Sequence, residues 1–297
     1  GATITYIWQS STDNNNFSTI ASANADIYNP PSGLTVTTYY RRITVATLNS
    51  IACQSVPTNV LTVTVQSVPT AGSIGSDQTI CNGGDPAAFT STTDGTGDGV
   101  ITYQWQSSLN NSSWSNISSA TSATYDVPSG LTATTYYRRV TVSTLNGVAC
   151  LSVASNVITV TVQSVPTAGV IATAQTICNG GDPALFTSTT NGTGSGVISY
   201  KWQFSTDNSS FTDIAGETSS TYDAPGGLTV TTYYRRITVS TLNGVACLSV
   251  PTTSIAVTVQ TVPTAGLIAT AQTICYNGDP AAFTSTTNGT GSGAITY

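Results

Sequence analysis

Few side chains of this sequence could carry out catalysis. Its 297 residues include no His, which removes Ser-His-Asp and Cys-His nucleophilic systems and the commonest general base. A glycosidase would need two carboxylates held a few Å apart, and few acidic residues recur along the chain. They are Asp85 and Asp182, Asp126 and Asp223, with Asp279 and Asp26 as further counterparts. Because Asp85 lies in an Asn-Gly-Gly-Asp-Pro turn that favours Asp for its own geometry, we predict that the chain is not an enzyme.

Asp94 and Asp98 are the candidate calcium ligands. Both lie in the Gly-rich turn DGTGDG, and hard cations such as Ca²⁺ take carboxylate and carbonyl oxygens. The corresponding turns later in the chain read NGTGSG, so neither carboxylate recurs. A zinc site is not expected, because so few Cys without any His do not supply four ligands at finger spacing. We therefore predict no metal site and no cofactor, with Asp94 and Asp98 kept only as calcium candidates.

A Tyr-Tyr-Arg-Arg block is the most distinctive polar feature, and it occurs three times, at 39–42, 136–139 and 233–236. Period-two alternation decides which of its side chains face the core of a β-protein. If the Val residues that follow the block point inward, Tyr136 and Arg138 point inward too. We then expect Tyr136 at the position of a tyrosine corner and Arg138 against Trp105.

The two other side chains of each block would then lie on the outer face. Tyr137 and Arg139, with Tyr234 and Arg236 in the next block, are the predicted surface-binding residues, for anionic glycans or a neighbouring strand. These blocks hold six of the seven basic residues, so no basic stripe forms and nucleic acid is not an expected partner.

The elements that position these side chains belong to a tandem repeat. Trp8, Trp105 and Trp202 are each 97 residues apart, as are the corresponding Cys residues, without insertion or deletion. We divide the chain into the C-terminal part of a first repeat (1–66), complete second and third repeats (67–163 and 164–260), and the N-terminal part of a fourth (261–297). We expect it to be a section of a longer array; in the alternative, the partial repeats of successive molecules complete one another in trans.

Strand signals dominate each repeat. In the second, VITYQWQS (100–107) places Ile101, Tyr103 and Trp105 on one face, and TYYRRVTV and VITVTV read as two further long strands. About seven short strands with Gly, Pro and Asn turns between them are typical of a two-sheet sandwich. The predicted fold is all-β: tandem Ig-like antiparallel sandwiches with a 97-residue repeat and one disulfide per domain.

The strings QTICNGGDP, YQWQSS, TYYRRVTV and SNVITVTV together resemble the PKD-like and Ig-like repeats of giant cell-surface proteins from Bacteroidota. These include the gliding-motility adhesins that the type IX pathway secretes. The resemblance covers the whole chain and implies a secreted location at the bacterial cell surface. It does not specify one protein, because such modules also occur in filaments and in the non-catalytic tails of secreted enzymes.

Two pairings of the six Cys are open. Within repeats the bonds would be Cys81–Cys150 and Cys178–Cys247; between repeats they would be Cys53–Cys81, Cys150–Cys178 and Cys247–Cys275. The first and last strands of a sandwich are commonly neighbours, and a disulfide needs Cα atoms within about 7 Å. We therefore expect the pairing within repeats.

The function expected from these features is structural or adhesive: an extracellular region that forms a surface filament or stalk and supports cell adhesion. The alternatives are a carbohydrate-binding accessory region of a secreted enzyme and a self-assembling fibre subunit completed by strand exchange. Expected partners are neighbouring repeats of the same or identical chains and surface polysaccharide. The sequence contains no run of about 18 apolar residues, so we do not expect this segment to insert into a membrane.

Overall fold

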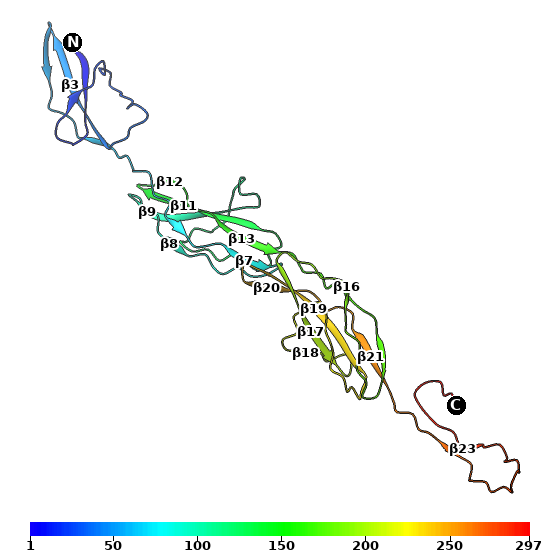
Figure 1. Cartoon of the computed structure of the whole chain (residues 1–297). Helices are drawn as coiled ribbons and strands as arrows, with labels where there is room; N and C mark the ends of the chain where they lie inside the picture. The colour runs from blue at the N-terminus through cyan, green and yellow to red at the C-terminus, as the bar shows by residue number, and fades with distance from the viewer. The chain divides into compact units, whose positions relative to one another are not determined.

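The computed structural model describes every residue from Gly1 to Tyr297 and contains strands, turns and loops but no helix. No helical segment is therefore available to cross a membrane. Contacts between Cα atoms divide the chain into two compact units, and Figure 1 labels many of their strands. One unit comprises Gly1–Asp77, Ala87–Val127 and Thr135–Thr159, and the other Gln78–Pro86, Pro128–Thr134 and Val160–Tyr297.

The strands recur with the repeat. In the first repeat they are β1 (Thr3–Ser11), β2 (Ser18–Thr19), β3 (Thr38–Leu48), β4 (Ile51–Gln54) and β5 (Leu61–Val63). In the second they are β6 (Ser73–Ile74), β7 (Gln78–Cys81), β8 (Ser91–Thr93), β9 (Val100–Ser108), β10 (Ser115–Asn116), β11 (Thr135–Leu145), β12 (Val148–Ala154) and β13 (Ile158–Gln163). In the third they are β14 (Val170–Ile171), β15 (Gln175–Cys178), β16 (Ser188–Thr190), β17 (Val197–Ser205), β18 (Thr212–Asp213), β19 (Thr232–Leu242), β20 (Val245–Leu248) and β21 (Ile255–Gln260). The fourth contains β22 (Leu267–Ile268) and β23 (Ser285–Thr287).

The third repeat shows the complete arrangement. Its larger sheet has the order β15-β21-β19-β17-β18, and β20 also pairs with β19. The long strands β17 and β19 are antiparallel, in a register that places Trp202 opposite Arg236. At one edge β15 runs parallel to β21, with Cys178 opposite Gln260. Strands β14 and β16 form a separate short sheet, which supplies the second layer of the sandwich.

The core of the third repeat is built from both layers. Phe186 is fully buried. The centroid of its ring lies 6.0 Å from that of Trp202 and 5.0 Å from that of Tyr234. Backbone hydrogen bonds between Phe186 and Tyr222 hold it there. The buried cluster comprises Ile171, Phe186, Trp202, Tyr222, Ala224, Tyr234 and Val257. A segment from the beginning of the repeat therefore completes a core whose other residues come from its later strands.

The other repeats have the same registers. In the second, β9 pairs with β10 and β11, Trp105 lies opposite Arg139, and β7 runs parallel to β13 with Cys81 opposite Gln163. In the first, β1 pairs with β2 and β3, and β3 with β4 and β5. The fourth has the hairpin of β22 and β23. The prediction of an all-β tandem array of Ig-like sandwiches is confirmed, as is the inward direction of Trp105, which is 0% exposed.

Candidate functional site

The structure reverses the predicted faces of the Tyr-Tyr-Arg-Arg block. Tyr137 is 4% exposed and Arg139 is 0% exposed, and their counterparts Tyr234 and Arg236 are 3% and 0% exposed. The residues that alternate with them are half-buried on the outer face. The prediction that these four residues form an exposed binding surface is therefore wrong.

The reason lies in what covers the inner face of β11. Beyond the block, that face presents Thr141 and Ser143, both fully buried, while Val140 and Val142 lie half-buried on the outer face. The Gly-rich turn packs directly on the inner face, so closely that a Cβ built at Gly95 would overlap Oγ1 of Thr141. Larger side chains would prevent this contact. The Val residues therefore point outward, opposite to the assumption behind the prediction.

Arg139 joins the two layers of the second repeat. Its Nη1 donates to the carbonyl oxygen of Ala123 at 2.6 Å, and its Nη2 donates to that of Thr93, the last residue of β8, at 3.3 Å. The guanidinium lies 4.1 Å from the ring centroid of Tyr103, a contact that contributes about 2 kcal/mol when desolvated. Burial lowers the pKa of Arg139, yet a guanidinium stays charged in proteins. Its role is to hold the sandwich together.

The outer face of each block carries a different arginine, stacked on an aromatic ring. Nε of Arg138 donates to Oε1 of Gln106 at 2.7 Å, and its guanidinium lies 4.1 Å from the ring centroid of Trp114. The same stack occurs in the other repeats, as Arg41 over Phe17 at 3.9 Å and Arg235 over Phe211 at 3.8 Å. Because the guanidinium covers one face of the ring, that face is not free to stack on a sugar.

Asp94 and Asp98 accept hydrogen bonds from the protein itself. Asp94 accepts one from the hydroxyl of Ser91 at 2.6 Å, and Asp98 accepts the backbone N–H of Ser67 at 2.6 Å, which lowers the pKa of Asp98. In the third repeat the hydroxyl of Ser195 accepts the corresponding N–H at 3.0 Å. The chain contains no cluster of three or more His, Cys, Asp or Glu side chains that could hold a metal ion. The side chain at position 98 therefore accepts a backbone N–H of the linker between repeats, and Ser at the equivalent position 195 accepts the same N–H.

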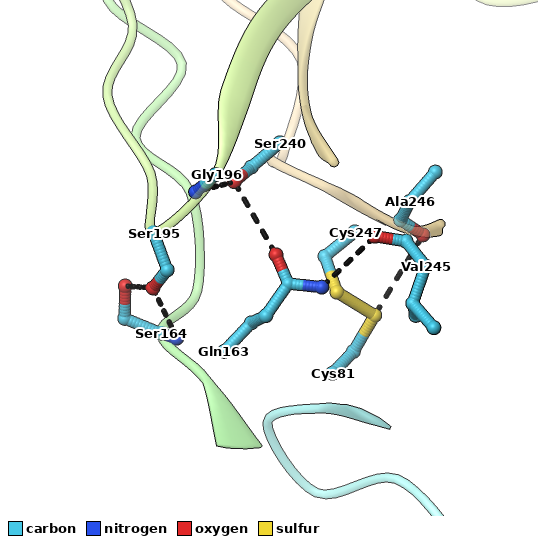
Figure 2. Close-up of a disulfide and its surroundings, with 9 residues drawn as sticks. All are labelled: Cys81, Gln163, Ser164, Ser195, Gly196, Ser240, Val245, Ala246 and Cys247. Atoms are coloured by element: carbon cyan, nitrogen blue, oxygen red, sulfur yellow. Dashed lines mark hydrogen bonds between the residues drawn. A yellow bond between two sulfur atoms is a disulfide. The ribbon is translucent and has the colours of Figure 1, made fainter. Parts of the chain in front are cut away.

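The disulfide of the structure joins two repeats. Cys81, at the end of β7, is bonded to Cys247 in β20, with their Cα atoms 5.6 Å apart (Figure 2). The sulfur of Cys81 also lies 3.7 Å from the carbonyl oxygen of Ala246. Close by, Nδ2 of Asn243 donates to the hydroxyl of Thr79 at 3.0 Å. Strand β7 of the second repeat is thus fixed to the β19–β20 hairpin of the third.

This bond corrects the predicted pairings. Cys81 does not bind Cys150, Cys178 does not bind Cys247, and none of the alternative pairings forms; Cys53, Cys150, Cys178 and Cys275 are unpaired.

The third repeat shows the physical reason. Cys178 lies opposite Gln260, three residues beyond the pair Thr232↔Val257, whereas Cys247 pairs with Ser240 towards the other end of β19. About eleven residues of strand separate the two levels, or roughly 36 Å. The first and last strands are indeed neighbours, but the two Cys lie at opposite ends of the sheet.

A buried glutamine lies beside the disulfide. Gln163, the last residue of β13, is 0% exposed; its Nε2 donates to the carbonyl oxygen of Val245 at 2.9 Å, and its Oε1 accepts from the hydroxyl of Ser240 at 3.4 Å (Figure 2). At the preceding junction, Gln66 makes the same two bonds, to the carbonyl of Val148 at 2.9 Å and from Ser143 at 3.4 Å. Each junction therefore docks the end of one repeat on the hairpin of the next.

Sequence reasoning missed this glutamine, although a signal for it was present. The same residue precedes every linker, in VQSVPTAG at 65–72 and 162–169 and in VQTVPTAG at 259–266. An amide that recurs at a fixed place between repeats indicates a fixed polar contact. No comparable signal gave the disulfide, because sequence spacing does not say at which end of a sheet a strand residue lies.

The sandwiches and their docked junctions define a tandem array of Ig-like domains. The chain belongs to the family described as Domain of unknown function (DUF8696), which matches residues 1–67, 70–164 and 167–261. No curated protein matches it.

Solved structures with tandem domains are similar to this chain at low identity. The three N-terminal domains of the bacteriophage RB49 Highly Immunogenic Outer Capsid protein (Hoc) are 12% identical, with a TM-score of 0.39 and coverage of 87% of this chain and 88% of that one. An E-to-A variant of titin domains I67–I69 is 10% identical, with a TM-score of 0.36 and coverage of 87% and 89%. Domains 3–5 of Drosophila OTK are 10% identical, with a TM-score of 0.33 and coverage of 87% and 86%.

Proposed function

We propose that this chain is an extracellular structural and adhesive repeat region, which forms part of a filament or stalk on a bacterial cell surface. The observation that carries the proposal is the bond between Cys81 and Cys247, which links neighbouring repeats. Disulfides persist in oxidising compartments, and a bond across a junction transmits tension from one repeat to the next. The resemblance to Bacteroidota surface repeats supports a gliding-motility adhesin of the type IX secreted kind as the parent class.

The contacts at the junction support a mechanical role. The linker is not free there: Gln163 is buried against the third repeat, and the backbone N–H of Ser164 donates to Ser195 at 3.0 Å. The proposed role requires no catalysis, because length and repetition supply it. The buried Arg–Tyr–Trp contacts stabilise each sandwich.

A carbohydrate-binding accessory role has weaker support. Sugar platforms need exposed aromatic faces, and the Trp residues of the complete repeats are either buried, as Trp105 and Trp202 are, or covered on one face by arginine, as Trp114 is. We therefore assign adhesion to the array as a whole and no sugar site to a single repeat.

Force spectroscopy tests the mechanical part. When the oxidised chain is pulled from its ends, the residues between Cys81 and Cys247 should not contribute to its extended length, because the disulfide bridges them. The two Cys are 166 positions apart. Reduction should then lengthen the fully extended chain by roughly 550–600 Å. The Cys247→Ser variant should behave like the reduced chain under all conditions. Equal lengths for the oxidised and reduced wild-type chain would contradict the proposal.

Surface labelling tests the location. Antibodies raised against the chain should label intact producing cells, and permeabilising the cells should add little signal. Labelling that requires permeabilisation would place the chain inside the cell and overturn the proposal.

A further inference from the structure

The third repeat contains an apolar cavity beside its buried core. Period-two alternation places Phe204 on the same face of β17 as the core residue Trp202, and the register of the sheet places it opposite Tyr234 of β19. Trp202 is 0% exposed, whereas Phe204 is 39% exposed. Next to Phe204 lies a cavity of about 360 Å³, which we call the Phe204 cavity. Its apolar walls come from Phe204, Ile214, Pro225, Leu228 and Val230.

The second repeat has a hollow at the same place. It measures about 390 Å³ and is lined by residues that include Ser107, Leu109 and Thr135, which are the counterparts of three residues that line the Phe204 cavity. The third repeat follows the second in the chain, yet Leu109 stays 73% exposed. The opening is therefore a property of the complete repeat. What distinguishes the third repeat is its lining, because Phe204 takes the place of Ser107.

Two tyrosine hydroxyls line the Phe204 cavity without a hydrogen-bond partner in the protein. Tyr222 is 7% exposed and Tyr234 is 3% exposed. In the second repeat Tyr137 is hydrogen-bonded to the side chain of Thr135. In the third repeat the hydroxyl of Thr232, the counterpart of Thr135, donates instead to a backbone carbonyl at 3.1 Å. Because buried polar groups are almost always hydrogen-bonded, the two free hydroxyls indicate a ligand atom that accepts from them.

The charges around the cavity favour an uncharged ligand. Burial raises the pKa of Tyr234 to about 12, and Tyr222 adds to this rise. Burial also raises the pKa of Tyr222, as do the nearby carboxylates of Glu217 and Asp223. Both hydroxyls are therefore protonated donors at neutral pH, and the carboxylates repel an anion. No Asp, Glu, Lys or Arg lines the cavity, so a charged ligand would lose its hydration without gaining a partner.

The wall formed by the loop before β19 is fixed by the repeat itself. The N–H of Gly180 donates to the carbonyl oxygen of Leu228 at 2.8 Å, and the N–H of Gly227 donates to that of Gly181 at 3.0 Å. A ligand therefore enters a formed site and orders little of the chain. An apolar cavity of about 150 Å³ holds one benzene ring. The Phe204 cavity, at about 360 Å³, has room for about two rings.

We propose that the third repeat binds an uncharged small molecule of about two rings that carries a carbonyl oxygen. Its rings pack on Phe204, Leu228 and Val230. Its oxygen accepts a hydrogen bond from the hydroxyl of Tyr222 or Tyr234. The second repeat does not share the site, because it has no ring at position 107 and the partner of its Tyr137 is already in place.

Fluorescence titration of the full chain tests the proposal. The probe is prodan, an uncharged naphthyl ketone whose emission moves to shorter wavelength in an apolar site, and the wild-type chain should bind it. Phe204→Ser, which introduces the residue of the second repeat, should weaken this binding about tenfold, because the ligand loses an aromatic wall. Val197→Ser is the matched control. It removes a 77% exposed valine at the other end of β17 and should leave the affinity unchanged.

A second variant tests the two hydroxyls. Tyr222→Phe combined with Tyr234→Phe keeps both rings and removes only groups that have no partner in the protein, so the repeat should stay folded. Displacement of prodan by acetylnaphthalene and by ethylnaphthalene compares two ligands of similar shape, of which only the first carries a carbonyl. The ratio of their affinities should fall about fivefold in the double variant, because the ketone alone loses a hydrogen bond.

Three results would overturn the proposal. They are a wild-type chain that does not bind prodan, binding that Phe204→Ser leaves unchanged, and a ketone-to-hydrocarbon ratio that the tyrosine variant leaves unchanged. Self-association of the wild-type chain that Phe204→Ser abolishes would assign the cavity to a second copy and would also contradict it. The extended lengths measured by force spectroscopy do not depend on the cavity, so the structural role is tested separately.

Discussion

The first and third repeats hold the same residues in two settings. Their long strands are alike: Trp8 lies opposite Arg42 as Trp202 lies opposite Arg236. The outer stacks agree too, because Arg41 lies 3.9 Å from the ring centroid of Phe17, against 3.8 Å for the equivalent pair. These features form from residues that are close in sequence and need no other part of the domain.

The core differs between the two settings. Val63 is 36% exposed where Val257 is 0% exposed, and Arg42 is half-buried where Arg236 is 0% exposed. What differs is the segment that carries β14, β15 and β16: its Ile171 and Phe186 pack into the core, and its β15 extends the edge of the large sheet of the third repeat. The hairpins of this fold are local, whereas its core forms only when segments from both ends of the domain meet.

The largest test of this comparison is removal of the core tryptophan. Trp202→Ala should lower the free energy of unfolding of the third repeat by about 3–5 kcal/mol, because it leaves a cavity among buried rings. Trp8→Ala should cost less than about 1 kcal/mol, because the ring of Trp8 contacts Tyr28 but no counterpart of Phe186. Denaturant titration followed by hydrogen exchange of peptides from each repeat measures both. Equal losses would show that 1–66 already has a core of its own.

The sequence allowed the fold to be predicted because its signals were local. The alternation of 100–107 correctly placed Tyr103 and Trp105 inside, and the period of 97 aligned every strand. The faces of β11 were predicted wrongly because Val140 and Val142 were taken as core residues. The Gly-rich turn packs against Thr141, and this contact decides which face of β11 is buried. The alternation of residues within one strand does not predict such a contact.

The cysteine pairing failed for a different reason. Strand adjacency was right, since β15 does lie beside β21, but adjacency does not give the level of a residue along the sheet. The bond from Cys81 to Cys247 further depends on how the end of one repeat docks on the next. That docking rests on single side chains such as Gln163 and not on a hydrophobic period.

The disulfide gives the second test. Cys247→Ser should lower the stability of the bonded region by about 2–4 kcal/mol, because the unfolded chain loses its cross-link. Cys53→Ser, the same change at the unpaired counterpart, should leave stability unchanged. Denaturant unfolding of both variants, with and without reductant, measures these changes in stability. A loss on reduction in Cys247→Ser itself would mean that another bond had formed.

The docking glutamines give a smaller effect. Gln163→Ala removes a fully buried amide that donates to the carbonyl of Val245 and accepts from the buried hydroxyl of Ser240, and should cost about 1–3 kcal/mol. Gln66→Ala removes the same bonds at a half-buried position, where water can replace them, and should cost about 1 kcal/mol or less. Amide exchange in β20 and in β12 reports each junction. A larger loss for Gln66→Ala would contradict burial as the deciding factor.

The smallest effect is a response to acid at the loop tips, which tests whether local elements are independent of the core. Oδ1 of Asp207 accepts from the hydroxyl of Ser205 at 2.7 Å and from the N–H groups of Ser209 and Ser210 at 2.8 Å. These bonds hold the pKa of Asp207 well below its ordinary value of 3.8, and the same holds for Asp13 in the first repeat. In the second repeat Asn110 takes this place.

Because the folded pKa is lowered, the contribution of Asp207 is complete above the ordinary pKa of 3.8 and is lost as the pH falls through the lower folded pKa. In strong acid, the amides of Ser209 and Ser210 should therefore exchange faster in the wild-type chain than in the Asp207→Asn variant. At higher pH this acid-dependent difference should be absent. The tip that contains Asp13 should respond equally, although its repeat lacks a covered core, and the Asn110 tip should not respond. An acid response at Asp207 alone would mean that the tip depends on the completed sandwich.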